Sequence, residues 1–381
     1  MYRPFRFDAV ELPPEADSLR AEVQAFLADW LPRWTPWERG HSWTGFDREF
    51  TRAVGARGWI GMTWPRSYGG AERTMLERYI VIEEMLAAGA PVGAHWISDR
   101  QSGPLILRLG TDAQRRKYLP EIVRGDACFC IGLSEPDAGS DLAAVRTRAE
   151  RCDGGWRING RKVWTTNAHL SDYMIALVRT EGTVENRHKG LSQFIVPMTA
   201  PGLTVRQIAD MTGEAHFNEV TFDDVVVDED ALIGHEGAGW EQATAELAFE
   251  RSGPDRFLSS FPAVMMLVDA ISTPDRLASR GIGQMVAELA VLRSMSLSLA
   301  GMLQDGLMPN TEAVVVKELG VELEQRTPEL VRALVGGSGA AVEGGLSEIQ
   351  AALLQLAPTF SLRGGTREIV RGIMARGLGL R

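Results

Sequence analysis

Residues 156–168 read WRINGRKVWTTNA, and this stretch carries the strongest local signals in the chain. Asn159-Gly160 is a favoured pair for the two-residue loop of a β-hairpin. The segments 156–158 and 162–164 flank it with aromatic and β-branched residues, which are typical of strands. Asp153-Gly154, just upstream, is a second turn signal. The stretch therefore predicts antiparallel strands joined by a hairpin turn at Asn159-Gly160.

Short runs with the same strand character surround this stretch from about Cys128 to about Gly234. They alternate apolar and polar residues or are continuously apolar, as strands of a partly buried sheet do. The runs are VRTRAE (145–150), YMIALV (173–178), SQFIV (192–196), LTVRQI (203–208) and VTFDDVVV (220–227). The sequence therefore predicts an all-β segment over residues 128–235.

Helical periodicity dominates before and after this segment, because apolar residues recur there at three- and four-residue steps. Asp17 or Ser18 can cap the first helix, and Thr111 with Gln114 fits a capping box. We therefore predict an α+β multidomain protein with a helical domain at 1–127, a β domain at 128–235 and a helical domain at 236–381. The stripes are Leu19, Val23, Phe26, Leu27 and Trp30; Met75, Tyr79, Ile82 and Leu86; and Met285, Leu289, Leu292 and Leu299.

Composition excludes several classes of protein. The 381 residues, 45% apolar and 24% charged, suit a folded chain with a large core. A net charge of −10 disfavours nucleic acid as a partner. The three cysteines, Cys128, Cys130 and Cys152, give no disulfide framework and no zinc spacing, so we expect a cytoplasmic protein without a metal. The longest apolar runs, such as 263–268, are too short to span a bilayer, and residues 1–17 contain no apolar core of signal-peptide length.

Two stretches of the β segment could bind a planar ligand. LSEPDAGSDL (133–142) offers the hydroxyls of Ser134 and Ser140 and accessible backbone N–H groups, although an ordinary loop has the same composition. Trp164 offers a flat apolar face with hydroxyls nearby at Thr165 and Thr166. A core tryptophan with solvent-facing threonines is the alternative.

Two stretches of the last third could also be functional. LRGGTREI (362–369) places Gly364 and Gly365 before a cap at Thr366, where a helix N-terminus can accept a phosphate, or where the chain makes a plain turn. ELAFERSGPDRF (246–257) places the pair Glu250-Arg251 beside apolar side chains and a helix break. That pair is either an ion pair on a helix surface or a positioned base. Neither a phosphate-binding P-loop nor a dinucleotide-binding glycine motif is present in the sequence.

Taken together, these stretches resemble the acyl-CoA dehydrogenase family of flavoproteins. The stretches that carry the resemblance are CIGLSEPDAGSD (130–141), WRINGRKVWTTNA (156–168), GLSQFIVPMTAPGLTV (190–205), FNEVTFDDVVVDEDALIGHEGAGW (217–240) and GGTREIVRGIMARGLGL (364–380). They cover nearly the whole chain in the family's order. The resemblance implies an N-terminal helical domain, a central β-barrel-like domain and a C-terminal four-helix bundle.

The resemblance also implies a non-covalently bound FAD and an acyl-CoA substrate. The backbone of Leu133 and the side chain of Ser134 would meet the flavin pyrimidine edge, Trp164 would pack on the flavin rings and Thr166 would lie near N5. The implied contacts to the adenosine diphosphate and to the phosphopantetheine come from Thr366 and Glu368, and from Ser140, respectively.

The position of the catalytic base separates subgroups of the family. Many members carry a glutamate directly before the Gly-Thr of the C-terminal motif, where this chain has Gly364. A second subgroup carries the base in a Glu-Arg pair on the bundle helix, which is Glu250-Arg251 here. The resemblance therefore implies that Glu250 removes the α-proton, that the Gly364 N–H binds the thioester carbonyl and that Arg251 contributes to substrate binding.

Two departures affect the expected partners. The family's Arg-x-x-Phe-Gly is replaced by SRGIGQM (279–285) with Arg280 displaced, and VGGSGAAVEGG (335–345) lacks the usual preceding Gln. A homodimer, a homotetramer or a heterotetramer with a sister subunit is therefore expected, with an electron-transfer flavoprotein as acceptor. The alternatives are a non-catalytic or half-site partner subunit, an oxidase, and a dehydrogenase of carrier-protein thioesters.

Overall fold

The computed structural model describes residues 5–182, 187–251, 253–271, 275–338 and 344–380, without the side chains of 246–250 and 336–338. By internal contacts, the chain divides into two compact units. The sheet unit comprises Phe46–Glu72 and Gly93–Leu247, and the helical unit comprises Met1–Gly45, Arg73–Val92 and Ala248–Arg381. The domain boundaries at residues 127 and 235 stay a prediction.

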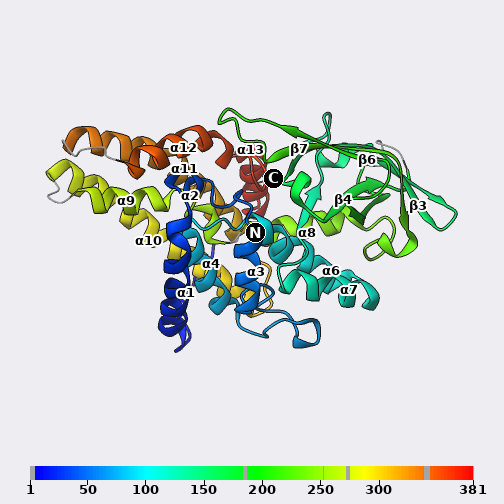
Figure 1. Ribbon diagram of the computed structural model, residues 1–381, viewed down its shortest axis with the longest axis horizontal. Helices are drawn as coiled ribbons and strands as arrows, with labels where there is room; N and C mark the ends of the chain where they lie inside the picture. The colour runs from blue at the N-terminus through cyan, green and yellow to red at the C-terminus, as the bar shows by residue number, and fades with distance from the viewer. Residues whose placement is uncertain (1–4, 183–186, 252, 272–274, 339–343, 381) are drawn as a thin grey trace. The chain divides into compact units, whose positions relative to one another are not determined.

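Among its described residues, the sheet unit contains seven strands, four α-helices of its own and several shorter 3-10 and π turns, and α8 (Gly239–Glu250) spans the boundary between the two units. The strands form one sheet in the order β1-β4-β2-β3-β7-β6, with β5 paired to β4 (Figure 1). The helices are α3 (Arg48–Ala56), α5 (Gly93–Ile97), α6 (Gly103–Leu109) and α7 (Asp112–Val123), and the strands are β1 (Phe129–Gly132), β2 (Arg148–Cys152), β3 (Gly155–Thr166), β4 (Tyr173–Arg179), β5 (Leu191–Pro197), β6 (Leu203–Ile208) and β7 (Phe217–Asp228).

The sheet confirms the predicted all-β segment. Most pairs are antiparallel, whereas β1 pairs with β4 in parallel. Alternate residues of the strands bury one face, where Trp156 meets Phe194 edge-on at 5.1 Å. The capping box of α7 is also confirmed, because Thr111 and Gln114 exchange both hydrogen bonds.

The predicted hairpin turn at Asn159-Gly160 is wrong. β3 continues through these residues, and the β2–β3 turn lies at Asp153-Gly154 instead. Because β3 pairs with β2 on one side and β7 on the other, the Asn-Gly pair stays within the strand, and Asn159 lies opposite a two-residue bulge of β7 at Asp223 and Asp224. Gly160 takes φ +142°, and Asn159 exchanges two hydrogen bonds with Asp224, at 2.9 and 2.8 Å.

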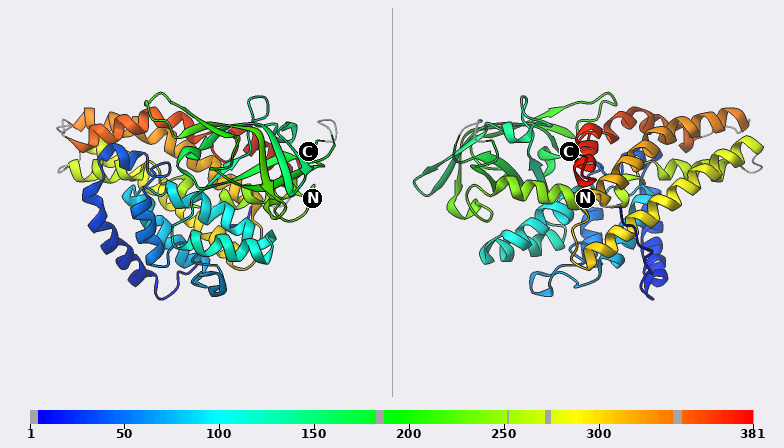
Figure 2. Two further views of the ribbon diagram at one scale, coloured as in Figure 1. Left: turned by 45° about the vertical axis from the view of Figure 1, so that its right-hand side comes forward. Right: turned by 180° about the vertical axis from the view of Figure 1, so that it is seen from behind.

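The helical unit is built from three separate stretches of the chain. In the two views of Figure 2, the long helices α10 and α11 (yellow and orange) run side by side, and both pack on further helices of this unit. Its helices are α1 (Ala16–Trp30), α2 (Pro36–Gly40), α4 (Met75–Ala88), α9 (Phe261–Ala270), α10 (Arg276–Gln304), α11 (Asn310–Ser338), α12 (Gly345–Phe360) and α13 (Arg367–Gly377).

The first predicted apolar stripe is buried along α1, as expected. The predicted cap at Asp17 or Ser18 is wrong, because α1 begins at Ala16 after Glu15 and lacks a side-chain cap. Among the described residues, α10 is long and apolar enough to cross a membrane by length and composition, which the sequence analysis did not expect. α10 packs on α4 and α11, and its Arg293 pairs with Glu83 at 2.6 Å, so in this structure it is a packed helix of the helical unit.

Candidate functional site

The loop that follows β1 is held against β3 by two hydrogen bonds to its backbone. The carbonyl of Leu133 accepts from Lys162 Nζ at 3.1 Å, and the carbonyl of Ser134 accepts from the Val163 N–H at 2.9 Å. Both contacts lie within two residues of Trp164. The sheet unit therefore brings together three of the predicted cofactor residues, namely Leu133, Ser134 and Trp164.

A buried ion pair fixes this loop. Lys162 Nζ lies 2.8 Å from Glu135 Oε1, and the lysine is fully buried. Glu135 also accepts from the backbone N–H groups of Arg146 and Thr147, at 2.7 and 2.9 Å. Burial lowers the pKa of Lys162 to about 8, although the charge of Glu135 opposes the shift. For Glu135, burial acts to raise the pKa, but Lys162 and the two N–H donors outweigh it, and the pKa lies below its ordinary value.

Trp164 is not a core tryptophan, because 58% of it is exposed. It lies at a second irregularity of β3, between Lys162 and Thr165, and takes φ +60°, which is unfavourable for an aromatic residue. The indole ring meets Phe217 edge-on at 5.9 Å. Strained backbone that presents a large apolar ring is characteristic of a binding position rather than of a stabilising one.

The threonines beside Trp164 differ from each other. Thr165 is buried, and its hydroxyl has no hydrogen-bond partner within the described structure. Thr166 is half-buried at the end of β3. The alternative with both threonines facing solvent is therefore wrong, and the predicted contact of Thr166 with flavin N5 stays a prediction.

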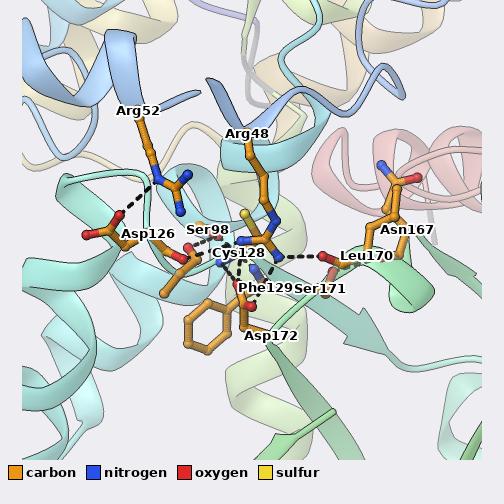
Figure 3. Close-up of polar contacts among 11 residues, drawn as sticks. Arg48, Arg52, Ser98, Asp126, Cys128, Phe129, Asn167, Leu170, Ser171 and Asp172 are labelled. Atoms are coloured by element: carbon orange, nitrogen blue, oxygen red, sulfur yellow. Dashed lines mark hydrogen bonds and ion pairs between the residues drawn. The ribbon is translucent and has the colours of Figure 1, made fainter. Parts of the chain in front are cut away.

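A polar cluster anchors the turn that follows Thr166 (Figure 3). Arg48 of α3 forms an ion pair with Asp172 at 3.0 Å and donates to the Leu170 carbonyl at 2.7 Å. Asp172 also accepts from the Cys128 N–H, and Ser171 donates to the carbonyl of Asn167, which takes φ +54°. The end of β3 is therefore fixed from α3 and from the start of β1.

Ser140 lies on an exposed part of the same loop. Beside it, Gly139 has open space around its Cα, and Asp141 forms an ion pair with Arg187. Ser140 is therefore accessible to a ligand, and its predicted contact with phosphopantetheine stays a prediction.

In the helical unit, the Glu-Arg pair and the Gly-Gly turn meet. Arg251 is 6% exposed, and its Nε donates to the carbonyl of Gly364 at 2.9 Å. A solvated surface pair is therefore wrong for Arg251, and its substrate contact stays a prediction. Glu250 is the last residue of α8, and its side chain lies outside the described residues, so its role as a base stays a prediction.

Thr366 occupies the N-cap position of α13 with an extended backbone, φ −63° and ψ 162°. Its side chain makes no cap hydrogen bond to the helix. The pKa of Glu368 lies below its ordinary value because the carboxylate accepts from its own backbone N–H and then from the Thr366 side chain. The first turn of α13 therefore differs from a simple phosphate-binding helix N-terminus, because it carries an exposed carboxylate beside its backbone N–H groups.

The two groups of predicted residues lie in different units. The sequence did not reveal the four buried charged residues that hold these two groups in place. Lys162 and Glu135 lie inside the quoted motifs but received no role. The other two are Lys317 and Glu324 of α11. A lysine at a core position of an apolar stripe, as in AVVVK (313–317), was the available signal. Within the described residues, no group of three or more His, Cys, Asp and Glu side chains could hold a metal ion.

Comparison with known proteins agrees with this arrangement. Three acyl-CoA dehydrogenase family models match the chain: the N-terminal domain at residues 13–126, the middle domain at 130–225 and the C-terminal domain at 273–379. The chain belongs to the acyl-CoA dehydrogenase family, whose members are flavin-dependent oxidoreductases. Its helical N-terminal part, central curled sheet and helical C-terminal part are the fold of that family.

Individual relatives match over almost the full length. Acyl-CoA dehydrogenase IpdE1 of Mycobacterium tuberculosis is 33% identical over 383 residues, covering 96% of this chain and 98% of that protein. The ChsE4-ChsE5 complex from Mycobacterium tuberculosis aligns with a TM-score of 0.82 and 30% identity, over 98% of this chain and 99% of that one. The Tcur3481-Tcur3483 steroid ACAD aligns with a TM-score of 0.83 and 27% identity, over 97% and 98% of the two chains.

Proposed function

We propose that this protein is an FAD-dependent dehydrogenase that converts an acyl-CoA thioester into the trans-2-enoyl-CoA. The observation that carries the proposal is the exposed Trp164 on strained backbone, next to a loop whose backbone is clamped by Lys162. An aromatic face beside fixed backbone groups fits the flat ring system of a flavin, which needs stacking and hydrogen bonds at one edge. Membership of a flavoprotein family supports the same cofactor.

In this proposal, each predicted residue contacts one part of FAD or of the substrate. Trp164 packs on the flavin rings, Thr166 lies near N5, and Leu133 and Ser134 bind the pyrimidine edge. Thr366 and Glu368 contact the adenosine diphosphate part, and Ser140 contacts the phosphopantetheine of the substrate. The bound FAD supplies the acceptor for the hydride that leaves the β-carbon.

The chain itself provides the acid–base chemistry. The Gly364 N–H donates to the thioester carbonyl, which acidifies the α-carbon because negative charge develops on that oxygen as the proton leaves. Glu250 takes the α-proton, and the electron pair of the broken C–H bond forms the α,β double bond. A carboxylate suits this role because it is ionised at neutral pH, and a dry site raises its pKa toward the working pH.

The test is Glu250→Gln, with Glu241→Gln as the matched control on the exposed face of the same helix. We expect Glu250→Gln to bind FAD normally and to slow substrate-dependent bleaching of the flavin by about 10³-fold, the scale of a lost general base. The control should bleach at the wild-type rate. Wild-type bleaching in Glu250→Gln would show that Glu250 is not the base.

The acyl group in this proposal is bulky, such as a steroid side chain. A base on the bundle helix, with glycine in place of glutamate at 364, changes the shape of the pocket, and the aligned Tcur3481-Tcur3483 protein is described as a steroid ACAD. An anaerobic titration with straight-chain, branched and steroid acyl-CoAs would identify the substrate. Bleaching by straight-chain substrates alone would contradict this choice.

The partners in this proposal are a sister subunit and an electron-transfer flavoprotein. Each of the two aligned complexes is named for two different chains. The altered residues around Arg280 indicate that two identical subunits would make incomplete contacts to FAD across their interface. Purification alone and with the genomically neighbouring chain, followed by a count of FAD per chain, tests the assembly. Peroxide release in air would instead identify an oxidase. The three free cysteines support a cytoplasmic location.

A further inference from the structure

One face of α11 carries buried polar residues instead of apolar ones. Lys317, Gly320 and Glu324 are spaced at i, i+3 and i+7, which places them on the same face of the helix. Lys317 and Glu324 are 1% and 0% exposed. At Gly320, a Cβ would lie 2.2 Å from the carbonyl oxygen of Arg256, so only glycine permits this close approach. We call these three residues the polar face of α11.

Glu324 of the polar face holds the residue before the Gly-Gly turn. Its carboxylate pairs with Arg363 at 2.6 Å and accepts from the Ser259 N–H at 2.8 Å. Arg363 also donates to the Ser259 hydroxyl at 2.9 Å. The chain just after the Glu-Arg pair and the chain just before Gly364 are thus tied to the same carboxylate.

Lys317 holds the turn itself. Its Nζ donates to the carbonyl of Gly365, and Arg251 donates to the carbonyl of Gly364 at 2.9 Å. Both glycines take positive φ, +69° and +97°. Two buried cations therefore bind two successive carbonyl oxygens of a turn that few other sequences could adopt.

These contacts fix the direction of the N–H groups in the turn. The carbonyl and the N–H of a trans peptide point in opposite directions. With the Gly364 carbonyl on Arg251, the Gly365 N–H points away from that guanidinium. With the Gly365 carbonyl on Lys317, the Thr366 N–H points away from the ammonium. The Gly364–Gly365 and Gly365–Thr366 peptides are thus oriented. The Gly364 N–H lies one peptide earlier, next to Arg363, whose side chain is held by Glu324.

We propose that Lys317 is a positioning residue for the dehydrogenation: together with Arg251, it fixes the Gly364–Gly365 turn so that the turn's N–H groups are presented to the thioester carbonyl. This inference rests on the proposed function. Lys317 is 1% exposed, and its charged donor holds the Gly365 carbonyl more strongly than a neutral donor would. Arg251 follows Glu250 directly, so the end of α8 that carries the base also holds the donor turn.

The experiment compares Lys317→Met, which keeps the length but removes the donor, with Lys317→Gln, which keeps a neutral donor. Arg332→Met, at an exposed position of the same helix, is the control. The first readout is amide hydrogen exchange of residues 361–368 without substrate. The second is the pKa of a bound 3-oxoacyl-CoA, because donation to its thioester carbonyl favours the enolate. The third is the separation of kcat from KM.

We expect Lys317→Met to bind FAD, to exchange the amides of the turn at least tenfold faster and to raise the pKa of the bound 3-oxoacyl-CoA. We expect kcat to fall on the order of 10²-fold with little change in KM, the scale of a misplaced catalytic group. Lys317→Gln should lie between Lys317→Met and the wild type. If Lys317→Met does not fold, Lys317→Gln carries the same comparison, with smaller changes in the same direction.

Two outcomes are distinguishable. An active wild type, with both Lys317 variants matching Arg332→Met in all three readouts, would overturn the role of Lys317 and leave the proposed function intact. A wild-type protein whose flavin no acyl-CoA bleaches, with or without its sister subunit, would overturn the proposed function and this inference with it.

Discussion

Two lysines, Lys162 in the sheet unit and Lys317 in the helical unit, are buried and donate to backbone carbonyl oxygens. Each of the two carbonyls lies in a loop that carries predicted site residues. A charged donor binds a carbonyl about twice as strongly as a neutral one, but its burial has a desolvation cost. Both lysines therefore hold their loops in place at some cost to the free energy of unfolding. This is expected of residues that position a reacting centre.

The desolvation of Lys162 predicts a pH dependence. Its pKa of about 8 in the folded protein lies below the ordinary value of 10.5, so between these values the unfolded chain binds more protons. The contribution of Lys162 to the free energy of unfolding should therefore rise as the pH increases from about 8 to about 10.5. It should reach its lowest level below pH 8.

Urea unfolding of the wild type and of Lys162→Met at intervals from pH 7 to 10 would measure this contribution. The difference between the two free energies of unfolding should move in favour of the wild type as the pH rises. Lys189→Met, at an exposed position, should follow the wild type at every pH. A constant difference between wild type and Lys162→Met would mean that Lys162 has no lowered pKa.

At the scale of elements, the strands were predictable and their irregularities were not. Alternation located β6 and β7, because a strand with one buried face has period two, and continuous apolar runs located β4 and β5, which are buried on both faces. Asn159-Gly160 favours a hairpin when judged locally, yet β3 pairs on both sides and keeps these two residues inside the strand, opposite a bulge of β7. The motif around Trp164 was likewise recognisable, but its exposure depends on the second irregularity of β3.

Lys317 and Glu324, which hold the candidate site in place, could not be predicted from the sequence for a different reason. The contacts of Lys317 and Glu324 join residues that lie 39 to 65 positions apart, and local patterns carry no information on such pairs. In a helical stripe, a lysine is normally predicted to lie at the surface, because lysine is almost never fully buried unless it is paired. Only the tertiary structure reveals that Lys317 binds the Gly365 carbonyl and that Glu324 binds Arg363 and the Ser259 N–H.

The position of Gly160 in β3, next to the bulge of β7, leads to a testable prediction. A Cβ at this position would lie 2.6 Å from the Thr147 hydroxyl oxygen, and its φ of +142° disfavours any side chain. Gly160→Ala should therefore lower the free energy of unfolding by about 1–3 kcal/mol, measured by urea denaturation. Gly139→Ala, where no atom lies within 4 Å of the added Cβ, should change it by less than about 0.5 kcal/mol. Equal effects in the two variants would contradict the bulge.

At the scale of the whole molecule, the helical unit is discontinuous in sequence. α4 contributes Leu76 and Tyr79 to a cluster with Leu297 and Ala300 of α10. α2 approaches α12 so closely that a Cβ on Gly40 would lie 3.0 Å from the Ala352 Cβ. The C-terminal helices therefore complete their core with residues from the first quarter of the chain.

This arrangement predicts that residues 254–381 cannot fold alone. Without α4 and α2, the fragment would expose the apolar faces of α10 and α12, respectively, that these two helices cover; α1, which packs on α4, would also be missing. It should keep helical far-UV circular dichroism, lose the near-UV signal and bind a hydrophobic dye, as expanded states without fixed packing do. Co-expression with residues 1–253 should restore a cooperative thermal transition, because the missing helices are supplied in trans. A cooperative transition in the fragment alone would mean that the four C-terminal helices and α9 form a self-sufficient core, and that α1, α2 and α4 are dispensable to it.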